Sequence, residues 1–356
     1  MLPGAYVERT SKEHLSGYSD WSEKGHAESW LLFPSNQGTR YSIDETQLGE
    51  DIVTILSNKD AHGGKGSIVA MVAGTKAHMV TSVLLKLPEE QREAVTEITM
   101  DFSESMRSIA EEAFPNATIV IDCFHIIKRT CDATEEIRLR EKRLTIIGQN
   151  KERSDFKKRL EHNRKQRKYY RKRHPKRYKG KKRGRKPARG NSAFRPETLD
   201  NGETKVELIT KSKHLLSMSR EKWSESQKKR AALLFELCPK IKEAYELVDS
   251  LRAVFRSKLT KEEASKKLHE WYQKVAECTL REVKAARDLI KSREQQVLNY
   301  FINRSTNAAA ESLNSKLKRF RAQLHGISHY TFFLFRVSRI FGYLATDICR
   351  CAEKFP

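Results

Sequence analysis

Three acidic residues stand far apart in this chain, and the first of them, Asp44, lies on a strand-like stretch where a charge needs a reason. Asp44 lies in the middle of RYSIDE, a strand-like stretch, and Asp101 directly follows the apolar stretch VTEITM. Glu311 lies in the helix-like segment STNAAAESLNSKLKR. Carboxylates that converge from different elements can hold two divalent metal ions beside a phosphate. These residues therefore predict two-metal phosphoryl transfer with two Mg²⁺ ions, for which Mn²⁺ can substitute.

The segment around Glu311 strengthens this interpretation. In a helix, Asn307, Glu311, Asn314 and Lys318 fall on one face, which then presents a carboxylate, two amides and a cation. Such a face suits a metal beside a phosphate. An ordinary alternative exists for each acid, because a lone helical Glu is usually solvated. An Asp at a strand end often caps the next helix, and Asp101 before FSES fits that role.

A second group, Asp122 and His125, forms a D-x-x-H pattern just after the apolar stretch IVI. One interpretation is a cap at a strand end followed by a packed histidine. The other is a pair beside Asp101 that orients a metal-bound water or the DNA, because neighbouring strand ends lie about 5 Å apart.

The elements that must position these residues follow from the apolar pattern. RYSIDE, DIVTILS and SIVAMVA, joined by turn-rich loops, predict three antiparallel strands. Strands at 95–100 and 117–121 alternate with helices, which predicts parallel pairing. Three antiparallel strands followed by two parallel ones is the ribonuclease H-like order, an α/β fold with a mixed sheet. After Phe124 the pattern turns helical, which predicts a long all-helical insertion that interrupts this core.

The chain of 356 residues exceeds one typical domain of about 100 to 200 residues, so several units are expected. The predicted boundaries are an N-terminal lead-in at 1–39, the first part of the core at 40–150, the helical insertion at 151–296, and the second part of the core with the Glu311 helix at 297–356.

The net charge of +23 predicts a polyanionic partner. Within the insertion, a basic arm at about 157–189 contains 19 Lys or Arg residues and one acidic residue, Glu161. Its string KRGRKP resembles an AT-hook, although a solvated basic linker or a nuclear-localisation signal has the same composition. The residues expected to contact DNA are Lys182, Arg183, Arg185 and Lys186 in the arm and Lys316, Lys318, Arg319 and Arg321 on the late helix.

Composition also argues against several classes of protein. The N-terminus lacks the pattern of a signal peptide, and no apolar run approaches the ~18 residues that a membrane helix needs. The six cysteines form no C-x-x-C pair, which argues against a structural zinc site and a secreted disulfide framework. We therefore expect an intracellular, cytoplasmic protein.

Two segments resemble one known family. VTEITMDFSESMRSIAEEAFPNATIVIDCFHIIK is similar to a segment of insertion-sequence transposases of the ISL-three family, and STNAAAESLNSKLKR is similar to that family's late helix. With YSIDET, the resemblance covers roughly 40–140 and 297–345. It implies that the DDE triad is Asp44, Asp101 and Glu311. If YSIDET is misplaced, the implied triad is Asp101, Asp122 and Glu311.

The resemblance also implies a function. Such an enzyme cleaves the ends of an insertion sequence and joins them to target DNA, so the expected partners are double-stranded DNA and a second copy of the chain, in a bacterial, nucleoid-associated setting. The family usually carries an N-terminal zinc-binding and helix-turn-helix region that this sequence lacks. A separate N-terminal DNA-recognition polypeptide is therefore expected, unless the reading frame is truncated. The alternatives are a ribonuclease H-like nuclease without strand transfer and an inert, transposase-derived DNA-binding protein.

Overall fold

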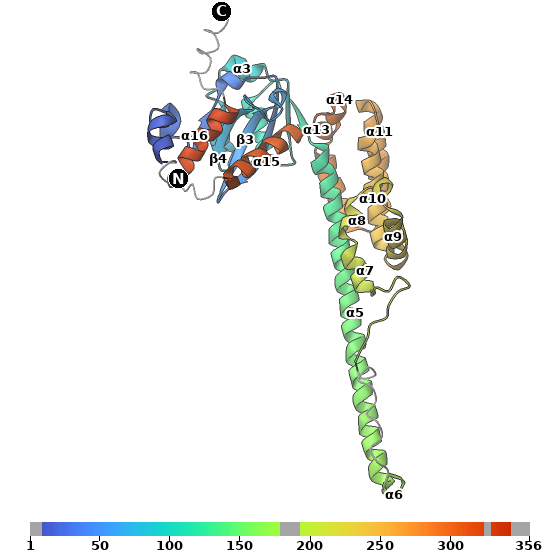
Figure 1. Cartoon of the computed structure of the whole chain (residues 1–356). Coiled ribbons are helices and arrows are strands. Elements are labelled where there is room, and N and C mark those ends of the chain that lie inside the picture. Colours follow the sequence, from blue (N-terminus) through green and yellow to red (C-terminus); the bar gives the residue numbers. More distant parts are fainter. Residues whose placement is uncertain (1–8, 179–192, 324–328, 343–356) are drawn as a thin grey trace, which may run out of the picture. The chain divides into compact units, whose positions relative to one another are not determined.

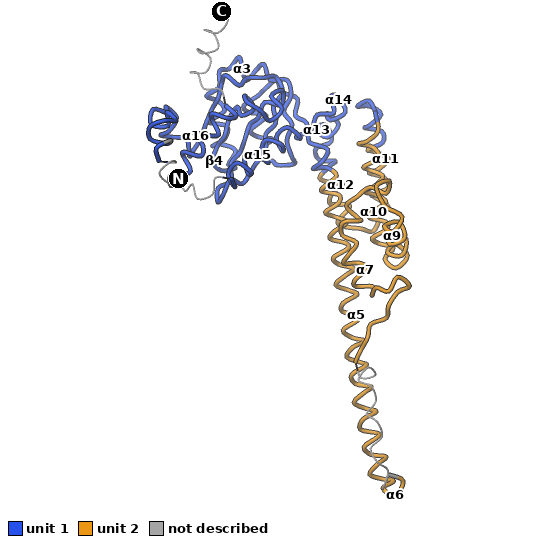
Figure 2. Tube along the Cα trace, viewed as in Figure 1, with its two compact units in different colours: residues 1–126, 258–267, 290–356 blue, residues 127–257, 268–289 orange. Residues whose placement is uncertain are grey.

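The computed structural model describes residues 9–178, 193–323 and 329–342 (Figure 1). Contact clustering divides the chain into two compact units (Figure 2). The core unit comprises Met1–Ile126, Lys258–Lys267 and Ile290–Pro356. The helical unit comprises Ile127–Ser257 and Leu268–Leu289.

A mixed six-stranded sheet forms the centre of the core unit, in the order β1-β4-β3-β2-β5-β6. The strands are β1 (Trp30–Leu32), β2 (Arg40–Leu48), β3 (Asp51–Asn58), β4 (Ile68–Ala73), β5 (Glu97–Met100) and β6 (Thr118–Ile121). The pairs among β1 to β4 are antiparallel, whereas β5 pairs parallel with both β2 and β6. This α/β arrangement is compatible with a ribonuclease H-like core. The sixth strand, β1, lies in the segment expected to be a lead-in, where only three residues pair.

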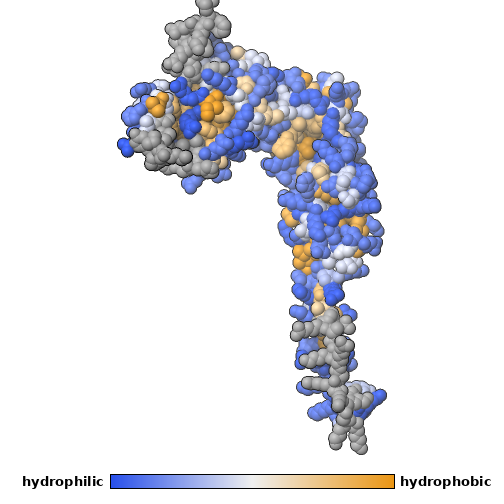
Figure 3. Space-filling view, viewed as in Figure 1, coloured by the Kyte–Doolittle hydropathy of each residue, from blue (hydrophilic) through white to orange (hydrophobic). Residues whose placement is uncertain are grey.

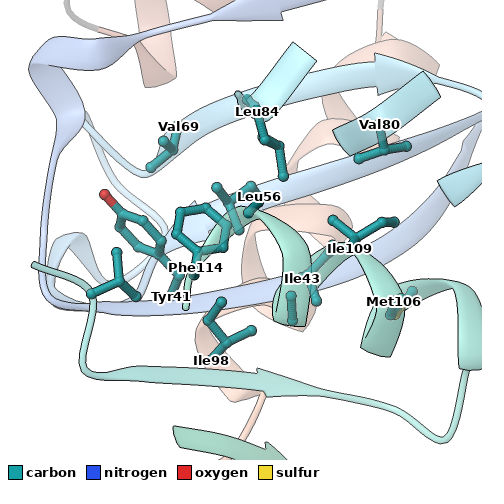
Figure 4. Close-up of a cluster of buried hydrophobic side chains, with 14 of the residues drawn as sticks. Tyr41, Ile43, Leu56, Val69, Val80, Leu84, Ile98, Met106, Ile109 and Phe114 are labelled. Atoms are coloured by element: carbon teal, nitrogen blue, oxygen red, sulfur yellow. The ribbon is translucent and has the colours of Figure 1, made fainter. Parts of the chain in front are cut away.

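One face of the sheet packs against two amphipathic helices, α2 (Ala77–Leu84) and α4 (Glu104–Ala113). Figure 4 shows side chains of β2 and β5, among them Ile43 and Ile98, converging with Leu84 and Ile109 of these helices. Tyr41, Ile43 and Leu56 pack on this face. Because strand side chains alternate between faces, the residues next to them in each strand point to the other side. That alternation assigns Asp44 to the opposite face.

The opposite face is covered by α15 (Ala308–Gln323) and α16 (Tyr330–Phe341) (Figure 1). Leu313 and Leu317 stand one helical turn apart on α15 and pack with Leu48 and Ile55 of the sheet. This apolar stripe fixes which face of α15 meets the strands. The other helices of this unit are α3 (Glu89–Glu93), α13 (Glu294–Leu298) and α14 (Tyr300–Asn303), with short helices at Ser11–Leu15, Ser22–Gly25, Pro34–Asn36 and Lys59–Ala61.

The helical unit has no strand among its described residues. It contains most of α5 (Cys123–Arg173), then α6 (Pro175–Tyr178), α7 (Lys205–Lys211), α8 (Lys213–Ser217), a short helix at Arg220–Lys222, α9 (Glu225–Leu237), α10 (Pro239–Arg256) and parts of α11 (Lys261–Glu277) and α12 (Arg281–Ser292). Trp223 stacks on Tyr245 at 5.0 Å between ring centroids. The buried Arg252 donates to the carbonyls of Ser217 and Met218 and to Cys131 Sγ, which ties α10 to α8 and α5.

The distal part of α5 differs from the rest of this unit. From Glu161 to Arg173 every residue is exposed. In Figure 3, hydrophilic residues cover most of the visible surface of the molecule. A helix that is polar on all sides has no apolar face with which to pack against the rest of a protein. Within the described residues, no helix is long and apolar enough to cross a membrane.

Candidate active site

The strand register brings three aspartates to one level of the sheet. Ser42 of β2 lies beside Thr99 of β5, and the same register continued by two residues places Asp44 level with Asp101. Between β5 and β6, Met100 lies beside Ile121, so Asp122 follows at the level of Asp101. The Asp122 amide donates to Met100 O at 2.9 Å, which extends this pairing. Neighbouring strands lie about 4.8 Å apart, so the three carboxylates form a short row.

Helix α15 contacts this row through the side chain of Asn314. Its Nδ2 donates to Asp44 Oδ2 at 2.7 Å, and the other carboxylate oxygen of Asp44 accepts from the Glu45 amide at 2.9 Å. Asn314 is buried, and its Oδ1 has no hydrogen-bond partner among the described residues. Glu311 lies one turn before Asn314 on the same helix and is exposed. The helix therefore carries Glu311 to the row of aspartates, with Asn314 as the direct contact.

Electrostatics show that the acids lie close together. Burial raises the pKa of the Asp44 carboxyl, and the charges of Asp101 and Glu311 add to this effect. The Glu45 amide and His125 act in the opposite direction. Burial likewise raises the pKa of Glu45, with contributions from Asp101 and Asp44. The predicted triad of Asp44, Asp101 and Glu311 is thus brought into one neighbourhood.

Asp101 is not the N-cap of the helix that follows it, as the alternative interpretation expected. The cap of α4 is Ser103, whose side chain accepts from the Met106 amide at 3.4 Å. Asp101 instead accepts from the Ser103 amide at 2.6 Å through Oδ1, a short turn that fixes the carboxylate just beyond the strand. Its other oxygen has no partner among the described residues, so it is free to bind a ligand.

Asp122 and His125 lie beside these acids. Asp122 is buried, and its two oxygens accept from the backbone amides of Phe124 at 3.1 Å and Asn307 at 3.3 Å. The carboxylate therefore joins the start of α5 to the residue that precedes α15. Asn307 is also buried, and in the part of the chain that the structure describes neither its Oδ1 nor its Nδ2 has a hydrogen-bond partner. The auxiliary residues expected from the sequence thus surround the triad.

The residues present fit divalent metal ions. Asp44, Asp101, Asp122 and Glu311 form no ion pair with a described residue. Carboxylate and amide oxygens are the ligands that Mg²⁺ prefers. The buried Asn314 Oδ1 receives no hydrogen bond from a described residue. Such an accumulation of unneutralised acids is typical of a site for cations.

The residues expected to contact DNA have different surroundings. Lys318 and Arg319 are exposed on α15. Lys316 donates to Gly63 O at 2.6 Å, and the Arg321 guanidinium lies 5.0 Å from the Phe333 ring centroid, so both have structural contacts. The four residues of the KRGRKP string, Lys182, Arg183, Arg185 and Lys186, lie outside the described residues.

Two features of this unit were not predicted from the sequence. Glu45 shares the electrostatic environment of Asp44 and Asp101, and the only local signal for it is its position next to Asp44. The second feature is a buried ion pair between Lys59 and Glu97, with Nζ and Oε1 2.9 Å apart. Lys59 lies in a turn-like sequence that gives no sign of a partner on β5.

Comparison with known proteins identifies the family of this chain. A family model described as a transposase, of the ISL-three DDE type, matches residues 41–337. This match spans most of the chain and includes every residue of the triad. Neither the curated proteins nor the solved structures gave a match.

Proposed function

Because the chain belongs to the ISL-three family of DDE transposases, we propose that it catalyses metal-dependent DNA strand cleavage and strand transfer of an insertion sequence, with Asp44, Asp101 and Glu311 as its catalytic carboxylates. The family accounts for transposase function in general and for a DDE-type nucleotidyl transferase. The specific chemistry and the residues are inferred from the site.

One observation carries this proposal. Asp44, Asp101 and Asp122 stand at one level on three adjacent strands, and α15 brings Glu311 to the same place. Acids that serve only solubility are dispersed over the surface, whereas these are gathered and partly buried, and no described cationic side chain forms an ion pair with them. A ribonuclease H-like core that supplies metal-binding carboxylates from its central strands explains both facts.

Each residue has a definable role. When bound, two divalent ions polarise the scissile phosphate and lower the pKa of an attacking water. Asp44 and Asp101 hold the cations from the sheet, and Glu311 holds them from α15. Asn314 fixes the rotamer of Asp44 through its bond to Oδ2. Asp122 fixes the start of α15 through its bond to the Asn307 amide.

The proposed reaction has two in-line displacements at phosphorus. Water first attacks the phosphodiester at the element's end, and the 3′-oxygen leaves as a hydroxyl. This 3′-hydroxyl then attacks a target phosphodiester, a new phosphodiester bond forms, and the target's own 3′-oxygen leaves. No covalent bond to the protein is required. The same carboxylates serve both steps, since the geometry at phosphorus is the same.

The exposed part of α5 is the surface that we assign to the DNA backbone. From Glu161 to Arg173 it carries seven Lys or Arg residues and one acidic residue, and every residue of this stretch is exposed. Phosphate contacts of this kind require no sequence recognition and weaken steeply with salt. Exposed Tyr169 and Tyr170 add rings that can stack on bases or sugars.

The helical unit is proposed to be an insertion between two parts of the catalytic core, since the chain leaves the core unit after β6 and returns to it before α15. Its role is to hold DNA near the site. A homodimer is also proposed, because transposition requires two element ends to be paired before they are joined.

The decisive experiment is a cleavage and joining assay with duplexes that carry the inverted repeats flanking the coding region, in Mg²⁺. Wild-type protein is expected to nick the end and form joined products. Glu311→Gln should abolish both, while Ser312→Ala, its exposed neighbour on α15, should retain both. Cleavage without joining would favour a nuclease, and equal activity of Glu311→Gln and wild type would refute the assignment.

A further inference from the structure

A second group of potential metal ligands adjoins the proposed catalytic carboxylates. One ligand atom from each of Asp122, His125 and Glu311 lies within 4.8 Å of the other two. Asp122 and His125 are three residues apart at the start of α5, so both face the same side of its first turn. Glu311 comes from α15, nearly two hundred positions later in the chain.

Backbone hydrogen bonds hold these three residues together. Asn307 donates its amide to Asp122 Oδ2 at 3.3 Å, and its carbonyl accepts from the Glu311 amide at 2.9 Å. Asn307 therefore connects the two acids directly. Asn307 is 1% exposed, and its side-chain Oδ1 and Nδ2 lack a hydrogen-bond partner within residues 9–178, 193–323 and 329–342. Buried polar atoms without partners beside a cluster of ligands are typical of a site completed by an ion and its waters.

The donor atoms are available for coordination. Neither ring nitrogen of His125 and neither oxygen of Glu311 bonds to another described residue. The ring of His125 instead contacts Phe124 edge-on, at 5.4 Å between centroids. Asp122 accepts a backbone amide at each oxygen and a hydrogen bond from the Cys123 thiol, which together orient the carboxylate and leave a lone pair for a ligand.

We propose that Asp122, His125 and Glu311 form a transition-metal site that shares Glu311 with the carboxylates of Asp44 and Asp101. The inference deepens the proposed function and takes its catalytic meaning from it. Imidazole nitrogen binds first-row transition ions more strongly than Mg²⁺, which prefers oxygen ligands. One of the two cation positions therefore accepts Mg²⁺ but binds a first-row transition ion such as Mn²⁺ or Zn²⁺ more tightly, whereas the other, built from carboxylates alone, accepts Mg²⁺ and Mn²⁺.

Pulsed electron paramagnetic resonance of bound Mn²⁺ tests this directly, because a coordinated imidazole modulates the signal through its nitrogen nucleus. The wild-type protein with Mn²⁺ alone should show ¹⁴N modulation. The modulation should change to the ¹⁵N frequency when only the histidines are ¹⁵N-labelled, a test that needs no substitution. An Mn²⁺ signal with water and oxygen couplings only would overturn the proposal.

Substitutions then identify the histidine. His125→Gln should abolish the nitrogen modulation and weaken Mn²⁺ binding at least tenfold while leaving Mg²⁺ affinity unchanged. His78→Gln is the control, since His78 is exposed on α2, against the opposite face of the sheet. Mn²⁺ affinity unchanged by His125→Gln would contradict the proposal.

The joining assay separates this inference from the proposed function. Nitrogen coupling without any cleavage or joining would leave the metal site standing and remove the transposase chemistry. Cleavage and joining without nitrogen coupling would do the reverse.

Discussion

The carboxylates at the two ends of strand β5 have opposite kinds of neighbours. Glu97 begins the strand, is 4% exposed, and bonds to Lys59 and to Asn303. Although burial acts to raise its pKa, hydrogen bonds from Ser305 and Lys59 lower it. Asp101 follows the other end, on the same face of the sheet, and among the described residues its carboxylate accepts one hydrogen bond, from a backbone amide. At one end Lys59 neutralises the charge of Glu97. At the other end Asp101 lies beside further acids, Asp44 and Asp122.

This difference indicates which end is functional. A buried carboxylate without a cation destabilises the folded protein, so it persists where it serves a reaction or a ligand. The pKa of Asp44 is raised by burial and by its acidic neighbours, whereas the pKa of Glu97 is lowered. The end that carries Asp101 is therefore suited to bind cations, and the Glu97 end is structural.

The largest expected effect concerns Asp101→Asn. Loss of a carboxylate that holds cations at the phosphate should reduce cleavage by about a thousandfold, or ~4 kcal/mol, because metal ions contribute several kcal/mol to the transition state. Urea unfolding should show that the variant stays as stable as the wild type. Exposed Asp20→Asn is the control and should cleave normally. A variant that kept a tenth of the wild-type rate would remove Asp101 from the catalytic set.

The next effect is at the other end of the strand. Lys59→Met should lower the free energy of unfolding by about 3 kcal/mol, because it leaves the Glu97 carboxylate buried without its ion-pair partner. Adding Glu97→Gln should recover most of that loss, since no buried charge then remains. Urea unfolding of the single and double variants measures both. If the double variant were as unstable as Lys59→Met, the charge would not be the cause.

The sequence predicted one end of β5 better than the other, for a physical reason. Asp101 directly follows an apolar run, and Asp44 interrupts an alternating one, so local pattern is enough to single them out. The parallel register then aligns them, because Ser42 of β2 lies beside Thr99 of β5, two residues before each aspartate. The Lys59–Glu97 pair depends on how a turn folds back onto a distant strand, and no local pattern encodes that contact.

Other differences between the elements predicted from the sequence and those in the structure also depend on whether a local pattern exists. Strand β1 was not predicted because three residues are too few to show an alternation. The pattern was predicted to turn helical after Phe124, and α5 begins at Cys123. A helix was also expected between the strands at 95–100 and 117–121, and α4 lies there with Ser103 as its cap. Elements with local signals were therefore predictable, whereas the contacts that complete the site required the fold.

A smaller effect is expected at Asn314, which touches Asp44 without being a proposed metal ligand. Asn314→Ala removes the bond to Asp44 Oδ2 and should weaken Mn²⁺ binding about tenfold to a hundredfold, as the loss of a residue that orients a ligand typically does. The free energy of unfolding should change little. Calorimetric titration with Mn²⁺ measures the affinity, and exposed Ser315→Ala is the control on the same helix. Unchanged Mn²⁺ affinity would leave Asn314 with a packing role only.

The smallest effect, and the most direct comparison with Glu97, concerns the pH dependence of stability. The pKa of Asp44 in the folded protein lies above its ordinary value of 3.8, so the folded state binds this proton more tightly than the unfolded state. The contribution of Asp44 to the free energy of unfolding therefore falls as pH rises from that value through the raised pKa, and the loss remains at neutral pH. Glu97 contributes with the opposite sign, because its folded pKa is lowered.

Asp44→Asn should accordingly raise the free energy of unfolding by about 1 kcal/mol at pH 8 in metal-free buffer, since it removes one of several like charges. The amide can still accept from the Glu45 amide, and the free Oδ1 of Asn314 can accept from its NH₂ group after a rotation. Added Mn²⁺ should stabilise the wild type more than the variant, because binding to the folded state alone stabilises it. Thermal unfolding in EDTA and in Mn²⁺ measures both differences. A variant less stable than the wild type in EDTA would mean that Asp44 is a structural carboxylate like Glu97, and the contrast between the two ends of β5 would fail.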